Sequence, residues 1–219
     1  MDKEYNKIFY IGLSRSGTTS LHRIISELGL KSVHLCGFLL LDEPKWEMCD
    51  QFDALGDSPV PLLFKELDSK YPNSKFIITI RQKEKWLESM KWMFNHGKVK
   101  WNWGERIHEY HESFYGTRYY DKRILTKHWN DYHQNVSDYF STSPDKLLTI
   151  RIEDGFDVGD ICAFLNLPYR EIPKTKFNSR VNISLIKRIR YNIIYYIRRA
   201  GLLIIRSFLG KGFKLRSHS

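Results

Sequence analysis

Glycine and hydroxyl side chains gather in one short segment near the beginning of the chain, Gly12-Leu13-Ser14-Arg15-Ser16-Gly17-Thr18-Thr19. A loop of this composition between a strand and a helix curls its backbone, so that several N–H groups and a helix N-terminus converge on one anion. The apolar run 8–11 supplies the strand, and apolar positions at helical spacing over 21–28 supply the helix. The segment therefore predicts a phosphate-binding loop, with a tight glycine turn and ordinary helix cap as the alternative.

The two glycines of this loop have the spacing of a Walker A motif, but the residue after the second glycine differs. The triphosphate-binding version has a Lys there, because that Lys reaches the β and γ phosphates. Thr18 occupies the position here, and the nearby cation, Arg15, lies inside the loop. The strand expected over 76–80 also ends in Arg81, where a Walker B motif would have Asp. These departures argue against an ATPase or GTPase.

Arg81 and Ser89 form a second candidate anion site. Arg81 ends the expected strand 76–80, and Ser89 lies eight residues later on the expected next helix. An arginine at the carboxyl edge of a strand and a hydroxyl on the following helix can grip one phosphate. The alternatives are a surface ion pair for Arg81 and an exposed helix position for Ser89.

Together these segments resemble the sulfotransferases that use 3′-phosphoadenosine 5′-phosphosulfate (PAPS). The family's 5′-phosphosulfate loop has a basic residue, a small residue and then Gly-Thr-Thr or Gly-Thr-Ser, and its second signature is the Arg strand followed by Ser, which grips the 3′-phosphate. The resemblance implies that the cofactor is bound by Arg15, Ser16, Gly17, Thr18, Thr19, Ser20, Arg81 and Ser89.

Three further elements are similar to one bacterial and eukaryotic sulfotransferase subfamily. They are an Asp-x-x-x-Asp-x-Pro segment, a Pro-Asn-Ser-Lys lead into the Arg strand, and a Tyr-Gly-Thr element, found here at 53–59, 72–75 and 115–117. The likeness covers about residues 8–182. It predicts a sulfotransferase-like P-loop domain over residues 1–182.

Sulfuryl transfer asks a protein to align donor and acceptor, to balance charge, and to supply a general base for the acceptor. Asp57, in the Asp-x-Pro element, is the first candidate base, and His34, at the end of the expected second strand, is the other. The alternatives are a turn or helix-capping role for Asp57 and a hydrogen-bonded structural role for His34. The mechanism requires no metal, and the segment 108–111, His-Glu-Tyr-His, lacks the zinc-motif spacing.

Alternating strand and helix signals predict the elements that must position these residues. Strands are expected over 8–11, 32–35, 76–80 and 147–152, and helices over 21–28, 62–71, 86–94, 124–140 and 158–165. This order predicts a single α/β domain with a central, mainly parallel sheet and helices on both faces. Residues 95–120 lack a clean period and predict a long functional loop or lid. Seven aromatic side chains are expected either to line an acceptor pocket or to pack beneath this lid: Trp92, Trp101, Trp103, Tyr110, Phe114, Tyr119 and Tyr120.

The net charge of +10 is concentrated at the end of the 219-residue chain. Residues 172–219 hold twelve Lys or Arg and no Asp or Glu, and apolar residues at helical spacing accompany them from 183 onward. We expect a basic amphipathic C-terminal helix, within a tail over residues 183–219, that lies on an anionic membrane surface. The alternative is that its apolar stripe packs on the domain. No RNA-binding module accompanies the tail, so a nucleic-acid partner is not expected.

These observations lead to one expected function and two alternatives. The expectation is a sulfotransferase that moves the sulfuryl group of PAPS to a hydroxyl or amine of an unidentified carbohydrate, lipid or small-molecule acceptor. The alternatives are a small-molecule kinase of P-loop architecture and a non-catalytic, membrane-associated nucleotide-binding protein. The three cysteines include no CxxC pair, and the apolar run 8–13 is too short for a secretory or membrane-spanning segment. The expected location is therefore cytoplasmic, peripheral to a membrane, with the oligomeric state left open.

Overall fold

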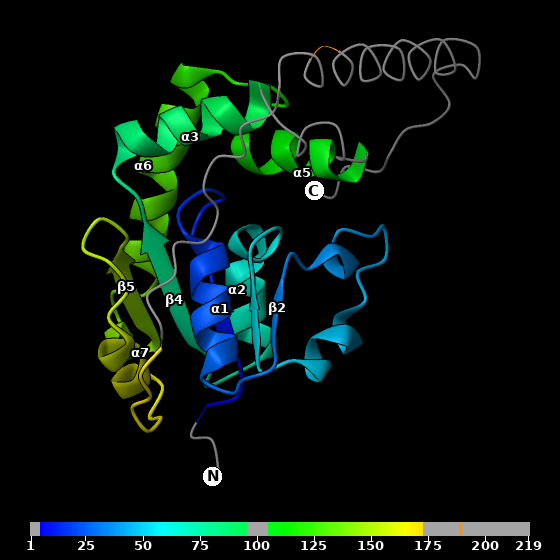
Figure 1. The fold of residues 1–219 in the computed structure, drawn as a ribbon. Coiled ribbons are helices and arrows are strands. Elements are labelled where there is room, and N and C mark those ends of the chain that lie inside the picture. The colour runs from blue at the N-terminus through cyan, green and yellow to red at the C-terminus, as the bar shows by residue number, and fades with distance from the viewer. Residues whose placement is uncertain (1–4, 96–104, 173–188, 190–219) are drawn as a thin grey trace.

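A parallel sheet forms the centre of the molecule. The computed structural model describes residues 5–95, 105–172 and 189 of the chain. In this part, five strands pair in the order β2-β3-β1-β4-β5, and every neighbouring pair is parallel (Figure 1). The strands are β1 (Ile8–Tyr10), β2 (Ser32–His34), β3 (Ala54–Gly56), β4 (Lys75–Ile80) and β5 (Leu147–Arg151). Because all run the same way, their carboxyl ends meet at one edge of the sheet.

Helices cover both faces of this sheet. Phe9, Leu55 and Phe76 share one hydrophobic cluster with buried residues of α2, α3, α5 and α6. The alternate positions, Tyr10 and Ile77, share the other cluster with α1 and α7. The helices are α1 (Thr18–Glu27), α2 (Val60–Lys70), α3 (Lys83–Asn95), α5 (Glu105–Tyr115), α6 (Lys122–Tyr139) and α7 (Val158–Phe164), and short 3₁₀ turns are η1 (Gly37–Leu39), η2 (Trp46–Gln51) and η3 (Pro144–Lys146). The predicted α/β architecture with helices on both faces is confirmed.

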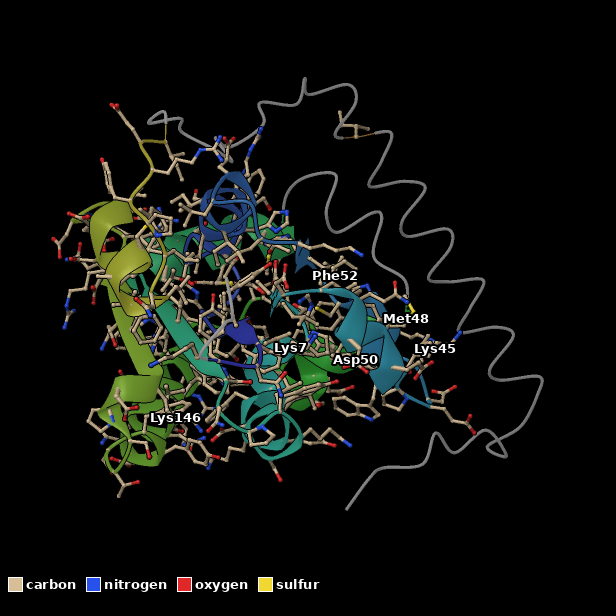
Figure 2. All side chains as sticks on the ribbon, turned by 90° about the horizontal axis from the view of Figure 1, so that it is seen from below. Lys7, Lys45, Met48, Asp50, Phe52 and Lys146 are labelled. Atoms are coloured by element: carbon tan, nitrogen blue, oxygen red, sulfur yellow. The ribbon has the colours of Figure 1, made fainter. Side chains whose placement is uncertain are left out.

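Polar contacts hold the opposite, amino-terminal edge of the sheet. Lys7, just before β1, donates from Nζ to the backbone oxygen of Phe52 at 2.8 Å. Lys146, just before β5, pairs with Asp68, which also accepts from the Tyr139 hydroxyl at 3.0 Å. Figure 2 views the molecule from this side and labels both lysines. These bonds fix the starts of β1 and β5. The opposite, carboxyl edge of the sheet carries the predicted site residues.

One strand was not predicted, and one expected loop contains a helix. β3 (Ala54–Gly56) falls in a segment without a strand pattern, because two of its three residues are Ala and Gly, which are depleted in strands; its pairing with β1 and β2 supplies the strand. Of the loop expected over 95–120, residues 105–115 form the helix α5 instead, and residues 96–104 lie outside the described residues. Its buried stripe consists of Tyr110, His111, Phe114 and Tyr115, and aromatic and histidine residues are weak helix formers, which hides the helical period from a sequence pattern.

The tail prediction lies outside the described residues, apart from Ile189, which is helical and exposed. Among the helices that are described, none has both the length and the apolar character needed to cross a bilayer.

Candidate functional site

The loop between β1 and α1 turns sharply at the carboxyl edge of the sheet. Gly17 caps α1 with a φ of 95°, a left-handed conformation that favours glycine. A Cβ at Gly17 would also lie 3.0 Å from Cγ2 of Ile152, and one at Gly12 would lie 2.0 Å from Oγ1 of Thr79. Both glycines are therefore required by close packing, and the turn leaves the first N–H groups of α1 without intrahelical acceptors. These N–H groups and the positive end of the helix dipole suit an anion.

Ser16 holds the loop in this shape. Its side chain is buried, its hydroxyl donates to the backbone oxygen of Leu13 at 2.6 Å, and its N–H donates to the same oxygen at 3.0 Å. Oγ of Ser16 also lies 2.9 Å from Oγ1 of Thr79 on β4. Ser20 is half-buried on the first turn of α1. The contact of Ser16 and Ser20 with a cofactor stays a prediction.

The two sequence signatures meet in space. Nε of Arg15 donates to Oγ of Ser89 at 3.0 Å, and Nη1 of Arg81 donates to the backbone oxygen of Arg15 at 3.2 Å. The Arg15 guanidinium also lies over the ring of Trp92, 5.0 Å from its centroid. Ser89 is buried, so the alternative of an exposed helix position is excluded. The loop, the end of β4 and α3 thus form one polar cluster.

One nitrogen of the Arg81 guanidinium is available to a ligand. Its Nε is buried and, among the residues that the structure describes, has no hydrogen-bond partner. A buried donor without an acceptor costs about 1–3 kcal/mol, so a buried guanidinium nitrogen without a partner is expected to meet a bound ion, ligand or water. An anion beside Arg81 and Ser89 would satisfy this nitrogen.

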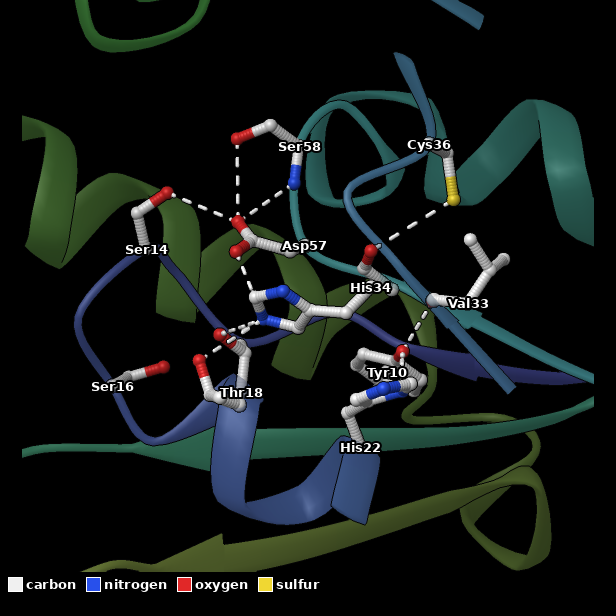
Figure 3. Close-up of polar contacts among 12 residues, drawn as sticks. Tyr10, Ser14, Ser16, Thr18, His22, Val33, His34, Cys36, Asp57 and Ser58 are labelled. Atoms are coloured by element: carbon white, nitrogen blue, oxygen red, sulfur yellow. Dashed lines mark hydrogen bonds and ion pairs between the residues drawn. The ribbon is translucent and has the colours of Figure 1, made fainter. Parts of the chain in front are cut away.

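The two candidate bases contact each other directly. His34 ends β2 and Asp57 follows β3, which pairs with β2 in register, so neighbouring strands present both side chains at the same edge. Nε2 of His34 lies 3.0 Å from Oδ2 of Asp57 (Figure 3). Oδ1 of Asp57 accepts from the N–H of Ser58 at 2.7 Å, and from the hydroxyls of Ser58 and Ser14 at 3.3 Å each. Sequence reasoning named both residues but did not predict their contact.

The surroundings of Asp57 keep its carboxyl group ionised. Burial alone raises its pKa, but the hydrogen bond and charge of His34, followed by the bonds from Ser58, outweigh burial and hold the pKa below its usual value. A carboxylate accepts but does not donate, so the contact directs the Nε2 proton of His34 toward Asp57. The other ring nitrogen, Nδ1, has no hydrogen bond to any residue in the described part of the chain. With the proton on Nε2, the lone pair of the imidazole is at Nδ1.

Two threonines of the loop lie next to the His34–Asp57 pair. Oγ1 of Thr18 and Oγ1 of Thr19 each lie 3.3 Å from Nε2 of His34. On the other side, the ring of His22 lies 5.5 Å from that of His34, and Tyr10 stacks at 6.5 Å. Burial, then the charges of His34 and Arg23, lower the pKa of His22. The His34–Asp57 pair therefore lies beside the turn that can hold an anion.

Three residues at the site were not assigned a role from the sequence. The N–H of Ser14 donates to Oη of Tyr115 at 3.1 Å, and Nε1 of Trp86 donates to the backbone oxygen of Ser14 at 2.9 Å. Tyr115 lies in the Tyr-Gly-Thr element, which was the available signal. Its distance along the chain from Ser14 gave no indication that the two touch.

The aromatic residues divide between packing and exposure. Tyr110 and Phe114 lie on α5 and are buried in the cluster that also contains Phe9, Leu55 and Phe76, which supports the packing interpretation for both. Tyr119 is 45% exposed, and Trp92 contacts Arg15 as described above. Trp101 and Trp103 lie outside the described residues. Across residues 5–95, 105–172 and 189, no group of three His, Cys, Asp or Glu side chains is placed to hold a metal ion.

The chain is similar to known proteins in sequence and in fold. A family profile described as "Sulfotransferase domain" matches residues 7–183. The fold is similar to that of a sulfotransferase from Alicyclobacillus acidocaldarius, with a TM-score of 0.53 and 18% identity, covering 92% of this chain and 96% of that one. A curated relative, "Ava biosynthesis cluster protein M" of Aspergillus versicolor, is 29% identical over 108 residues. That match covers 39% of this chain and 42% of the relative, so the chain spans about two fifths of that protein's length.

Proposed function

The chain belongs to the sulfotransferase family, and from this membership we propose that it moves the sulfuryl group of PAPS to a hydroxyl or amine of an acceptor. The observation that carries the proposal is the cluster of Arg15, Arg81 and Ser89, in which the loop and the end of β4 share hydrogen bonds. This arrangement offers two anion sites side by side, as a nucleotide with a 5′-phosphosulfate and a separate 3′-phosphate requires. A triphosphate, which places its charges in one row, matches it less well.

The residues present fit such a cofactor. The buried Nε of Arg81 has no acceptor within the described residues and can donate to a 3′-phosphate beside the Ser89 hydroxyl. The N-terminus of α1, with Thr18, Thr19 and Ser20, would hold the 5′-phosphosulfate, and Arg15 would balance its charge. When bound, PAPS supplies an activated sulfuryl group.

His34 is a better candidate for the proton acceptor than Asp57. The Asp57 carboxylate has a lowered pKa and accepts several hydrogen bonds, both of which make it a weak base. Its contact with Nε2 of His34 instead fixes the imidazole tautomer that leaves Nδ1 free to take a proton from the acceptor. Asp57, the first candidate from the sequence, then orients His34 and stabilises the imidazolium that forms. The acceptor can be a carbohydrate, a lipid or another small molecule.

Binding of nucleotides tests the cofactor. By calorimetry, adenosine 3′,5′-bisphosphate should bind at least about tenfold more tightly than ATP or adenosine 5′-monophosphate, because the others lack the 3′-phosphate that Arg81 and Ser89 grip. Preference for ATP would support the kinase alternative and refute PAPS as donor.

Transfer of label tests catalysis. The protein is incubated with ³⁵S-labelled PAPS and a cell extract, and sulfated products are separated and identified. Labelled product that depends on the protein supports a sulfotransferase and reveals the acceptor. Tight bisphosphate binding without labelled product across many acceptors would favour the non-catalytic nucleotide-binding protein.

The basic tail is proposed to attach the enzyme to anionic lipid. The family match ends at residue 183, and the following segment holds cations without any Asp or Glu. In vesicle sedimentation, deletion of 183–219 should abolish binding to phosphatidylserine vesicles; unchanged sedimentation would show that the tail does not mediate it.

The cysteines bear on the compartment. Cys36, Cys49 and Cys162 are buried and free, which accords with a reducing compartment such as the cytoplasm.

A further inference from the structure

Ser14 is the point at which three other elements meet the loop. Its N–H donates to Oη of Tyr115 at the end of α5, and its backbone oxygen accepts from Nε1 of Trp86 on α3. Its hydroxyl donates to Oδ1 of Asp57 at 3.3 Å. Ser14 itself is buried. One residue of the loop therefore connects the aromatic packing under α5 to the carboxylate that holds His34.

Tyr115 is fixed firmly enough to set the position of Ser14. Its side chain is 1% exposed, and its ring centroid lies 4.8 Å from that of Phe114, 4.9 Å from His128 and 6.4 Å from Trp86. This packing fixes the ring and, with it, the hydroxyl oxygen. Burial raises the pKa of the hydroxyl and hydrogen bonds with Ser14 offset only part of that rise, so Tyr115 stays protonated and is no base.

We infer that Tyr115 is a positioning residue for the Asp57–His34 pair, acting through Ser14. The inference rests on the proposed function, in which His34 accepts the proton. Tyr115 holds the N–H of Ser14, the Ser14 hydroxyl holds Oδ1 of Asp57, and Oδ2 of Asp57 holds Nε2 of His34. Without Oη, the buried N–H of Ser14 loses its acceptor and the serine moves relative to Asp57. The Asp57 carboxylate then keeps only its bonds from Ser58, so it can rotate relative to Nε2 and no longer fixes the His34 tautomer.

Tyr132 offers a matched control. Its hydroxyl is buried in the same aromatic cluster and donates to the backbone oxygen of Ile11 at 2.7 Å, just before the loop. Tyr132→Phe therefore removes a comparable buried hydrogen bond to the same stretch of chain. In contrast to Tyr115→Phe, it leaves the contacts of Ser14 and Asp57 intact. Comparing the two variants separates positioning from general loosening.

Four measurements are made on the wild type and on both variants of the full chain: thermal unfolding, calorimetry with adenosine 3′,5′-bisphosphate, the rate of transfer from labelled PAPS, and the ¹⁵N shifts of His34, which report its tautomer. Both variants should lower the melting temperature. Only Tyr115→Phe should slow transfer, by on the order of tenfold to a hundredfold, as expected for a misplaced catalytic group. Its bisphosphate dissociation constant should change by less than about threefold.

The tautomer of His34 is read in the ligand-free protein and does not depend on catalysis. In the wild type and in Tyr132→Phe the proton should be on Nε2, whereas Tyr115→Phe should give a mixture. The inference is overturned if Tyr115→Phe keeps both the rate and the tautomer, or if Tyr132→Phe loses them equally. A tautomer change confined to Tyr115→Phe, in a protein that transfers no label, would support the positioning link while refuting the proposed function.

Discussion

Nε2 of His34 lies 3.0 Å from Oδ2 of Asp57, at the ends of two neighbouring parallel strands. The distance makes the two residues one unit, because the carboxylate decides which nitrogen of the imidazole carries the proton. Substitutions at either residue should therefore affect the same step, by different amounts.

His34→Gln should lower the turnover number by about 10²–10⁴-fold, since an amide cannot accept the proton. Asp57→Asn should lower it as well, because the amide can donate to Nε2 and favour the wrong tautomer. Adenosine 3′,5′-bisphosphate should bind to both variants within about threefold of the wild type, as no contact to the nucleotide is removed. Rates and calorimetry on the same samples provide the check, and near-normal turnover of His34→Gln would exclude His34 as the base.

Arg81→Lys tests the grip on the 3′-phosphate. Lysine keeps the charge but lacks the planar fork that lets Nη1 hold the backbone oxygen of Arg15 while Nε serves a ligand. The affinity for adenosine 3′,5′-bisphosphate should fall by about tenfold or more, and the affinity for adenosine 5′-monophosphate should stay unchanged. Ser89→Ala should also weaken bisphosphate binding, but it removes an acceptor of Arg15 as well, so part of its loss should extend to adenosine 5′-monophosphate. Equal losses of Arg81→Lys for the two nucleotides would place the 3′-phosphate elsewhere.

Gly17→Ala tests the shape of the loop, with Gly29→Ala as its control. Both glycines have positive φ angles, 95° and 92°, so alanine should cost each about 1–2 kcal/mol in the free energy of unfolding. A Cβ at position 29 meets nothing within 4 Å, whereas one at position 17 meets Ile152 at 3.0 Å. Urea unfolding should show both losses, and calorimetry should show weaker bisphosphate binding for Gly17→Ala alone. If Gly29→Ala weakened binding equally, the effect would come from overall stability.

Much of this fold is visible in the sequence because burial leaves a pattern. The strand β4, which leads into Arg81, is rich in apolar and β-branched residues, since helices cover both of its faces, and four of its six residues are buried. The loop is visible because its glycines are required by the turn. By contrast, β3 is a strand because it pairs with β1 and β2. The helical period of α5 is obscured by tyrosines and histidines, which are weak helix formers.

The candidate site divides in the same way. Arg15, Arg81 and Ser89 stand in recognisable motifs, so the sequence names them, whereas the contact of His34 with Asp57 depends on the order of strands in the sheet. The contact of Ser14 with Tyr115 depends on how α5 packs over that edge. Neither packing nor strand order can be derived from spacing along the chain.

Acid should loosen the aromatic cluster under α5 before it affects the sheet. Burial, then the charge of His108, lowers the pKa of His111 to about 3, and burial, then the charge of His133, lowers the pKa of His128 to about 4. In the unfolded chain both titrate near the ordinary value of about 6.5. Below that pH the unfolded state binds more protons than the folded state, so the free energy of unfolding decreases as the pH falls from about 7 toward 4.

Urea unfolding at pH 7.5, 6 and 5 measures this loss, and a His128→Gln variant, which cannot take up the proton, should show a shallower dependence than the wild type. Because His128 packs against Tyr115 at 4.9 Å, protonation should also release the tyrosine that holds Ser14. The ring of Tyr115 should therefore become mobile at an acidic pH at which the sheet is still folded, which its NMR line widths would show. Simultaneous loss of the sheet and of the fixed Tyr115 ring would show instead that α5 and the sheet unfold as one unit.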